Sequence, residues 1–306
     1  MKRIPIAIGL LFLSNAAGAA IHKNIAAKTP DGLNISAQEY GNPQGPEIVL
    51  IHGLGQSHLS WKKQVESPLA KDFRILTYDL RGHADSDKPS DKSYYEEGKR
   101  WGDELKAVID AAGFKKPTLV GWSLGGVIIA NYLHTYGDKD LSGVVLVDAV
   151  VGFKAEFFGP GPKAGLVSDD LEPRVRGIAA FLRACFAKQP PMEDFELMLA
   201  YNAMVPREVQ RAVKHVTIEG AEVAFRQLKV PTLIIQGEED ALVTSATALY
   251  AKNLIKPAKL SFYPRVGHAP FYENPEQFNA DLRALLKETL KPGPQNNKPQ
   301  RKKQKL

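Results

Sequence analysis

Short, continuous runs of apolar residues recur along the chain, separated by longer segments of mixed character. The runs lie at residues 47–52, 75–78, 118–121, 144–147, 232–235 and 260–263. Apolar runs of this length are typical of strands that are buried on both faces of a parallel sheet. Residues 25–28 and 33–40 are predicted to add two strands around the turn at Asp31-Gly32.

Between these runs, apolar residues recur every three or four positions, which predicts amphipathic helices. The predicted helices span residues 59–69, 99–112, 124–136 and 275–290. Strands that alternate with helices in this way indicate an α/β fold with a doubly wound, mostly parallel sheet.

The alternation stops between residues 151 and 228, where no convincing strand pattern occurs. Three helical patterns, at residues 171–187, 192–204 and 207–216, are separated by joints that contain proline. We therefore predict that residues 151–228 form a helical cap, inserted into a core made of residues 20–150 and 229–290.

The amino terminus has the layout of a secretory signal peptide. Lys2 and Arg3 precede a short apolar run, and Ala17-Gly18-Ala19 matches a small-residue cleavage motif. We expect residues 1–19 to be removed and the protein to be exported, to the periplasm or the medium. The apolar run is about half of the roughly 20 residues that span a bilayer, so no stable membrane span is predicted.

The net charge of +6 is concentrated at the two ends of the chain. Residues 291–306 carry six basic residues and no acidic one, and they are rich in Pro, Gln and Asn, which predicts a disordered basic tail. Without this tail and the signal peptide the chain is slightly acidic, so no nucleic-acid partner is expected. The single cysteine, Cys185, lies in an apolar helical pattern and is predicted to be buried.

The strongest chemical signal is Gly121-Trp122-Ser123-Leu124-Gly125, between a predicted strand and a predicted helix. This is the G-x-S-x-G pattern of a nucleophile elbow in its strand–turn–helix context. The glycines allow a tight turn, and the helix amino terminus supplies positive potential where an oxyanion would form. Ser123 is therefore the candidate nucleophile, and Trp122 is a candidate substrate contact beside it.

A serine hydroxyl needs a base close by to accept its proton. His268 follows the last predicted strand, in Val266-Gly267-His268-Ala269-Pro270, and is the candidate base. The other histidines, such as His52 and His215, have contexts that favour this role less.

These motifs resemble those of the α/β-hydrolase superfamily, over most of the chain after residue 19. His52-Gly53-Leu54-Gly55 looks like the superfamily's oxyanion loop, and the resemblance implies that the backbone N–H groups of Leu54 and Leu124 bind the oxyanion. His52 is then expected to brace that loop. The histidine loop around His268 is also similar to that of the superfamily.

The same resemblance implies where the acid of a catalytic triad lies. The superfamily usually places it three residues after the glycine that follows the next-to-last strand, which gives Asp240 after Gly237. Asp148, at the end of the run at residues 144–147, is the competing candidate. Asp79 and Arg81, in a variant of the superfamily's D-x-R-G-x-G motif, are expected to hold loops together.

No phosphate-binding loop and no clustered metal-ligand motif occurs in the sequence, so no cofactor and no metal is expected. We predict a serine hydrolase that cleaves a small or medium hydrophobic ester through an acyl-enzyme. Six apolar residues of the cap are expected mainly to pack in the core, and some of them could also face the substrate. They are Phe157, Phe158, Leu182, Phe186, Leu197 and Met204.

Two other reactions can use the same triad. One is that of a cofactor-free perhydrolase or haloperoxidase, although many of those carry proline where this chain has Gly55. The other is C–C bond hydrolysis of ring-cleavage products. A non-catalytic binding scaffold would be expected to lack a triad residue, and none is missing here.

Overall fold

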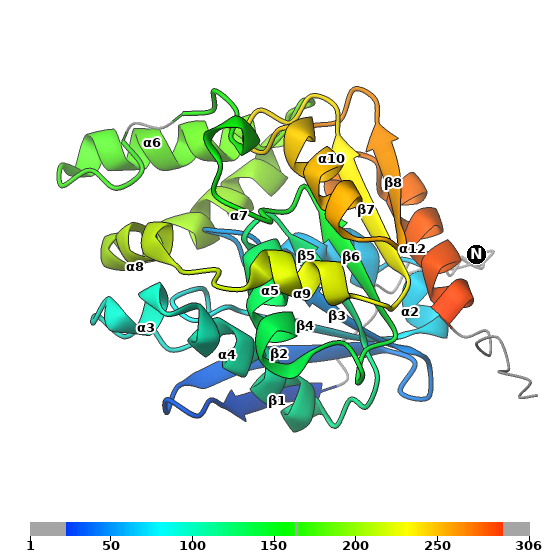
Figure 1. The fold of residues 1–306 in the computed structure, drawn as a ribbon. Coiled ribbons are helices and arrows are strands. Elements are labelled where there is room, and N and C mark those ends of the chain that lie inside the picture. The colour runs from blue at the N-terminus through cyan, green and yellow to red at the C-terminus, as the bar shows by residue number, and fades with distance from the viewer. Residues whose placement is uncertain (1–22, 163–164, 290–306) are drawn as a thin grey trace, which may run out of the picture.

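The computed structural model describes residues 23–162 and 165–289, and its centre is one eight-stranded sheet (Figure 1). The strands are β1 (Lys23–Lys28), β2 (Asn34–Gly41), β3 (Glu47–Ile51), β4 (Arg74–Tyr78), β5 (Thr118–Trp122), β6 (Gly143–Val147), β7 (Thr232–Gly237) and β8 (Ala258–Tyr263). They lie in the order β1-β2-β4-β3-β5-β6-β7-β8. β2 pairs antiparallel with β1 and β4, and every other neighbouring pair is parallel. The predicted α/β fold with a mostly parallel sheet is confirmed.

Helices cover both faces of this sheet. The first face packs against α4 (Gly98–Ala112), α5 (Leu124–Tyr136), α9 (Ala221–Gln227) and α10 (Ser245–Leu254). The second face packs against the 3-10 helix η1 (His58–Trp61), α1 (Lys62–Val65), α2 (Leu69–Asp72) and α12 (Pro275–Thr289). Two single-turn helices, α3 (Ser93–Glu96) and α11 (Pro270–Glu273), lie in loops.

The side chains of β3 show why its sequence is continuously apolar. Val49 and Ile51 point into the core beneath α4 and α5, whereas Ile48 and Leu50 point into the core beneath α12. Successive side chains of a strand point to opposite faces, so a strand covered by helices on both sides needs apolar residues at every position.

The described part of the segment between β6 and β7 contains helices joined by irregular stretches, and no strand. It holds η2 (Ala155–Phe157), α6 (Leu171–Ala184), α7 (Met192–Ala203), α8 (Arg207–Ala212) and η3 (Val213–His215), followed by α9. Figure 1 shows α6, α7 and α8 together at one end of the molecule, whereas α9 lies beside α5. Phe158 makes an isolated bridge to Val243, which lies after β7.

Several predicted helices have different bounds in the structure. The prediction of one helix over residues 59–69 is wrong, because the chain forms η1, α1 and α2 with a break before Pro68. The residue before a proline is disfavoured in helical conformation, and the Ser67 hydroxyl accepts a hydrogen bond from Leu69 N–H at the start of α2. α6 ends at Ala184, where Gln189 Nε2 donates to the Arg183 and Phe186 carbonyls. α9 and α10 were not predicted.

The ends of the chain lie outside the described residues. The predicted signal peptide, residues 1–19, and the predicted tail, residues 291–306, therefore stay predictions. Among the residues described, no helix combines the length and the apolar character needed to cross a bilayer. Cys185 is buried, as predicted.

A buried ion pair joins the loop after β4 to α4. Arg81 Nε donates to Glu104 Oε2 at 2.6 Å, and both side chains are fully buried. The same guanidinium bonds Asp31 at 2.8 Å and donates to the carbonyls of Tyr94 and Arg100. Arg81 therefore holds three segments together, as its motif predicted. Asp79 has a similar role, because its carboxylate binds the backbone N–H and the imidazole of His58.

Replacement of Glu104 by Gln tests the importance of this pair. The variant leaves the buried guanidinium with less compensating charge, so we expect the free energy of unfolding to fall by about 3 kcal/mol. Asp110→Asn, which breaks the exposed Lys106–Asp110 pair on the same helix, should change it by less than about 0.5 kcal/mol. Urea unfolding of the three proteins measures both, and equal losses would contradict this account.

Candidate active site

Ser123 lies at the turn between β5 and α5, with a backbone conformation that non-glycine residues rarely adopt. Its φ is 54° and its ψ is −114°. A Cβ added at Gly121 would lie 2.6 Å from Ile129 Cδ1, and one added at Gly125 would lie 2.9 Å from the Ile51 carbonyl oxygen. The strand and the helix therefore pack too closely for side chains at these glycines, which is the close approach that the motif predicted.

His268 and Asp240 meet in loops that follow β8 and β7. His268 Nδ1 lies 2.7 Å from Asp240 Oδ2, and the two side chains are only 2% and 1% exposed. The other carboxylate oxygen of Asp240 accepts hydrogen bonds from Leu242 N–H at 2.7 Å and Val243 N–H at 3.0 Å. Because Nδ1 faces a carboxylate, the imidazole holds its proton there and leaves Nε2 as the basic nitrogen.

An apolar cavity of about 370 Å³ brings these groups together. Ser123, His268, Leu54 and Leu124 all line it. The Ser123 hydroxyl makes no hydrogen bond to another described residue, and such contacts commonly tighten only when substrate binds. The structure thus places the predicted nucleophile, base and oxyanion-binding residues around one space.

The backbone N–H groups of Leu54 and Leu124 are available to a ligand. Neither donates to an acceptor within the part of the chain that the structure describes. Leu124 is the first residue of α5, so its N–H has no partner within the helix. A Cβ added at Gly53 would lie 3.0 Å from Ser123 Cβ, so the loop that carries Leu54 runs close beside the nucleophile.

Two buried histidines hold this loop. His52 Nε2 accepts from Leu80 N–H at 3.0 Å, and its Nδ1 lies 2.8 Å from the Gly53 carbonyl. His83 Nε2 accepts from Gly55 N–H at 3.1 Å. Burial lowers the pKa of His52 to about 3 and that of His83 to about 4, so both are neutral at physiological pH. They fix the loop without adding charge to it.

His52 was expected to brace the loop, but the role of His83 was not predicted. His83 lies 28 residues further along the chain than Gly55, in the loop after β4. The signal that could have found it is its place in the D-x-R-G-x-G motif. Because β3 and β4 are parallel neighbours, the loops at their carboxyl ends lie side by side.

Comparison with known proteins agrees with this geometry. The family model for the alpha/beta hydrolase fold matches residues 46–275. The chain belongs to the alpha/beta hydrolase family. The chain superposes on a candidate aryl esterase from Burkholderia cenocepacia with a TM-score of 0.85 and 41% identity, over 88% of this chain and 99% of that one.

Other alpha/beta hydrolases resemble this chain at lower identity. An esterase from Rhodococcus sp. is 30% identical with a TM-score of 0.80, over 87% of this chain and 99% of that one. A bifunctional esterase/perhydrolase from Acinetobacter calcoaceticus is 28% identical over 279 residues, which are 85% of this chain and 98% of the relative.

Trp122 does not occupy the place that the sequence suggested. Its side chain is 3% exposed and is absent from the cavity lining. Its indole N–H donates to the His268 carbonyl at 2.6 Å, and its ring packs edge-on against Phe271. Because side chains alternate along β5, Trp122 points away from the cavity and supports the loop of the base from behind.

The apolar residues between β6 and β7 divide into three groups. Phe157, Leu182 and Phe186 are buried, as predicted for core residues. Phe158 lines the cavity with Phe153, Leu166 and Phe181. The prediction of core positions for Leu197 and Met204 is wrong, because these side chains are 48% and 53% exposed on α7 and just after it.

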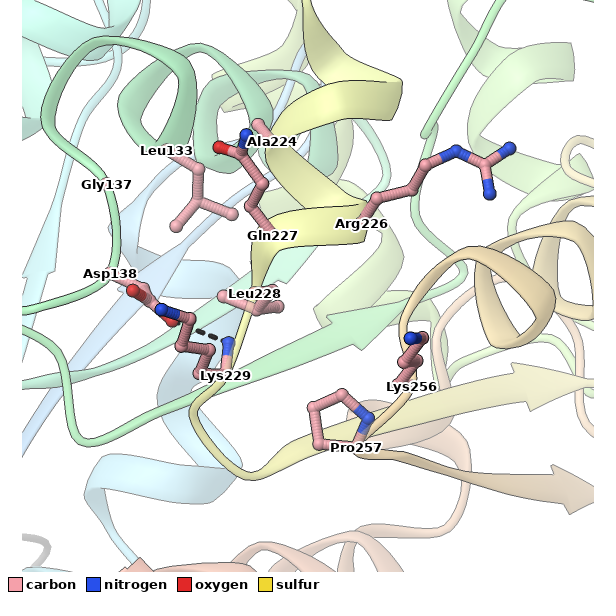
Figure 2. Close-up of a pocket in the computed structure, with 10 residues that line it drawn as sticks. All are labelled: Leu133, Gly137, Asp138, Ala224, Arg226, Gln227, Leu228, Lys229, Lys256 and Pro257. Atoms are coloured by element: carbon pink, nitrogen blue, oxygen red, sulfur yellow. Dashed lines mark hydrogen bonds between the residues drawn. The ribbon is translucent and has the colours of Figure 1, made fainter.

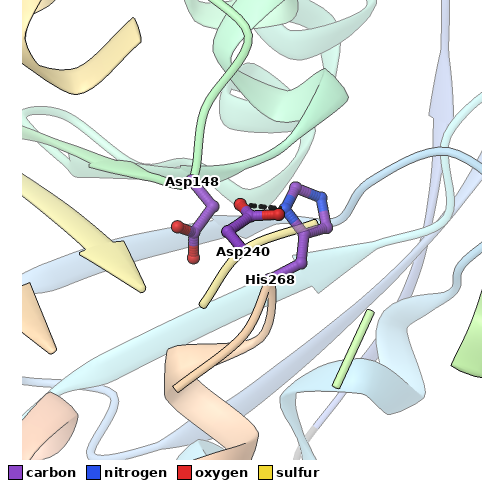
Figure 3. Close-up of side chains that lie close together, drawn as sticks. All are labelled: Asp148, Asp240 and His268. Atoms are coloured by element: carbon purple, nitrogen blue, oxygen red, sulfur yellow. Dashed lines mark hydrogen bonds and ion pairs between the residues drawn. The ribbon is translucent and has the colours of Figure 1, made fainter. Parts of the chain in front are cut away.

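Asp148, the competing candidate for the acid, lies beside Asp240 and not against the imidazole (Figure 3). Each of the side chains Asp148, Asp240 and His268 has a nitrogen or oxygen atom within 4.8 Å of the others. Asp240, and not Asp148, accepts the hydrogen bond from His268 Nδ1. Asp148 Oδ1 instead accepts from Gly237 N–H at 2.8 Å.

A larger cavity, of about 850 Å³, lies far from this chemistry (Figure 2). Its lining includes Asp138, Lys229 and Lys256, near the amino ends of β7 and β8, and contains neither Ser123 nor His268. The Asp138 carboxylate accepts Lys229 N–H at 2.6 Å and so closes the turn before β7. The smaller cavity is the candidate active site because Ser123 and His268 line it.

Replacement of Asp240 by Asn tests the candidate acid. An asparagine there would favour the wrong tautomer of His268, so we expect the rate of Ser123 labelling by a fluorophosphonate to fall by about 10³- to 10⁴-fold. The neighbouring exposed Glu239 serves as control, and Glu239→Gln should label at the wild-type rate. Mass spectrometry of the labelled peptide measures the rate. Full labelling of the Asp240 variant would assign the role to another group.

Proposed function

We propose that this alpha/beta hydrolase is a carboxylesterase that acts on small or medium hydrophobic esters. The observation that carries the proposal is the cavity lined by Ser123, His268, Leu54 and Leu124, where the two leucine N–H groups have no acceptor among the residues described. An ester carbonyl bound there can reach both the nucleophile and the oxyanion donors. No cofactor is needed for this chemistry.

The reaction proceeds in two halves. Ser123 Oγ attacks the carbonyl carbon while His268 Nε2 accepts its proton, and the Leu54 and Leu124 N–H groups bind the oxyanion. His268 then protonates the leaving alcohol, and an acyl-enzyme remains. Water, deprotonated by the same imidazole, attacks the acyl-enzyme and releases the acid. Asp240 accepts the hydrogen bond from Nδ1–H throughout and stabilises the imidazolium.

The cavity supports an apolar substrate of limited size. Apart from Ser123 and His268, Lys214 is the one polar side chain among its described lining residues. A volume of about 370 Å³ is near the lower end for small-molecule sites. Residues of the segment between β6 and β7, including Leu166 and Phe181, form one wall, in keeping with a cap that covers the site.

The relatives include esterases and enzymes of the two alternative reactions. The candidate aryl esterase and the Rhodococcus esterase share 41% and 30% of their residues with this chain. The Acinetobacter relative adds perhydrolysis to ester hydrolysis. A 2-hydroxymuconate semialdehyde hydrolase from Pseudomonas, 28% identical, represents C–C bond hydrolysis.

Hydrolysis of p-nitrophenyl esters, from acetate to decanoate, tests the proposal. We expect turnover with an optimum at short or medium acyl chains, and a loss of at least about 10⁴-fold in Ser123→Ala. Formation of a peracid from an ester and hydrogen peroxide, assayed in parallel, measures the perhydrolase alternative. Labelling of Ser123 without turnover of any ester would favour C–C hydrolysis, and the absence of both would favour a binding scaffold.

Phe181→Ala tests whether the lining from α6 sizes the pocket. Removal of the ring enlarges the cavity, so the ratio of kcat/KM for decanoate to that for butyrate should rise by about 10-fold. Met204→Ala removes an exposed apolar side chain that does not line the cavity and should leave the ratio unchanged. An unchanged ratio in both variants would mean that the acyl chain binds elsewhere.

A further inference from the structure

Asp148 is a buried carboxyl group for which the triad leaves no evident role. It follows β6, is 1% exposed, and has a positive φ of 42°. One oxygen, Oδ1, accepts the Gly237 N–H. The other, Oδ2, is buried and has no hydrogen-bond donor among the described residues. A buried carboxylate oxygen without a donor is costly, because it has lost its hydration.

None of the titratable groups that face Asp148 is a permanent cation. They are Asp240 after β7, His268 and Glu273 after β8, and Tyr263 within β8. No lysine or arginine forms an ion pair with Asp148 in the described part of the chain. Asp148 and Asp240 have carboxylate oxygens within 4.8 Å of each other. Two ionised carboxylates at that separation would repel each other in a buried site.

The hydrogen bonds indicate which carboxyl group of the two carries the charge. Asp240 is surrounded by donors: the Leu242 and Val243 N–H groups, His268 Nδ1, and Gln236 Nε2 at 3.4 Å. Asp148 has one donor, the Gly237 N–H. Donors stabilise the ionised form, so the negative charge belongs on Asp240 and the proton on Asp148.

We propose that Asp148 is a neutral carboxylic acid in the resting enzyme and donates a hydrogen bond from Oδ2 to the carboxylate of Asp240. Asp148 is thus a positioning residue that acts on the acid of the triad. When Oδ2 is protonated, it can donate a hydrogen bond to Asp240 and is no longer without a partner. Asp240 gains one more donor, which fixes its orientation toward His268. This role rests on the proposed triad, whereas the protonation state of Asp148 does not.

The electrostatics of the cluster agree with this assignment. Burial, followed by the negative charge of Asp240, raises the pKa of Asp148 well above its usual range, and the Gly237 N–H opposes this only in part. A neutral Asp148 also keeps a second negative charge away from His268. Such a charge would favour the protonated imidazole, so that His268 would act as a base only at higher pH.

Infrared spectroscopy tests the protonation state without any activity assay. In wild-type protein labelled with ¹³C at the aspartate carboxyl groups, we expect a carboxylic-acid C=O band between pH 6 and pH 8 that shifts with the label. The band should be missing from Asp148→Asn. Absence of any protonated aspartate from the wild type in this range overturns the proposal, whatever the substrate of the enzyme.

The pH dependence of stability gives a second test, with a defined sign. The unfolded chain releases this proton near the usual value of 3.8, whereas the folded protein keeps it to higher pH. Wild type therefore loses stability as pH rises through that interval, and Asp148→Asn does not. The Tm of the variant relative to wild type should rise by several degrees from pH 4 to pH 8. A constant difference contradicts a neutral Asp148.

Activity variants separate positioning from a merely structural contact. An asparagine can accept the Gly237 N–H and donate to Asp240, so Asp148→Asn should keep kcat/KM within about threefold, with its acidic limb unmoved. Asp148→Ala lacks the donor and should lose about 10-fold or more, with the limb displaced to higher pH. Asp138→Ala, which also removes a carboxylate from a backbone N–H before β7, is the matched control and should keep the wild-type profile.

Three outcomes overturn the positioning role. An Asp148→Asn enzyme as impaired as Asp240→Asn would make Asp148 the acid itself. An acidic limb displaced to lower pH in Asp148→Asn would mean that Asp148 is ionised in the wild type. Wild-type kinetics in Asp148→Ala would show that Asp240 needs no such support. If no ester is turned over, fluorophosphonate labelling of Ser123 against pH gives the same comparison.

Discussion

The backbone of Ser123, held at a φ of 54°, is the constraint on which the active site depends. A non-glycine residue persists in such a conformation only when its surroundings enforce it. Here β5 runs into α5 at Ser123, the Ser123 N–H is bound by the Val147 carbonyl, and its own carbonyl accepts from Val150 N–H. The turn presents the hydroxyl to the cavity and leaves the first N–H of α5 without an acceptor among the described residues. The candidate nucleophile and half of the proposed oxyanion site therefore come from one piece of backbone geometry.

The remaining groups reach that point because of the parallel sheet. Leu54 follows β3, His83 follows β4, Asp148 follows β6, Asp240 follows β7 and His268 follows β8. Parallel neighbours place all of these loops at one edge of the sheet, where ligands of open α/β sheets bind. The large cavity of Figure 2 lies near the amino ends of β7 and β8, and its described lining has charged side chains but no serine, threonine or cysteine.

The sequence was most informative where a local pattern of residue types is compatible with only one kind of structure. Continuous apolar runs predicted the strands of the parallel sheet, and the glycines around Ser123 predicted the close approach of strand and helix. It was less informative where tertiary contacts decide. The break at Pro68 and the exposure of Leu197 depend on packing that no local pattern records. Trp122 was assigned to the cavity by adjacency along the chain, yet the pleat of β5 turns it toward Phe271. His83 and Asp148 contact groups that are distant in sequence, the N–H groups of Gly55 and Gly237, so these contacts could be found only in the structure.

The triad by itself does not decide between the reactions of the relatives. Ester hydrolysis and perhydrolysis share the first half-reaction and differ in the molecule that attacks the acyl-enzyme. That choice depends on what the cavity admits beside His268 Nε2, and part of its wall comes from irregular chain. Phe153, Phe158 and Leu166 come from the irregular chain between β6 and α6, and Phe153 and Phe158 stack with ring centroids 6.3 Å apart. The sheet can therefore stay constant while these side chains change, and relatives with 28–41% identity include a candidate aryl esterase and a bifunctional esterase/perhydrolase.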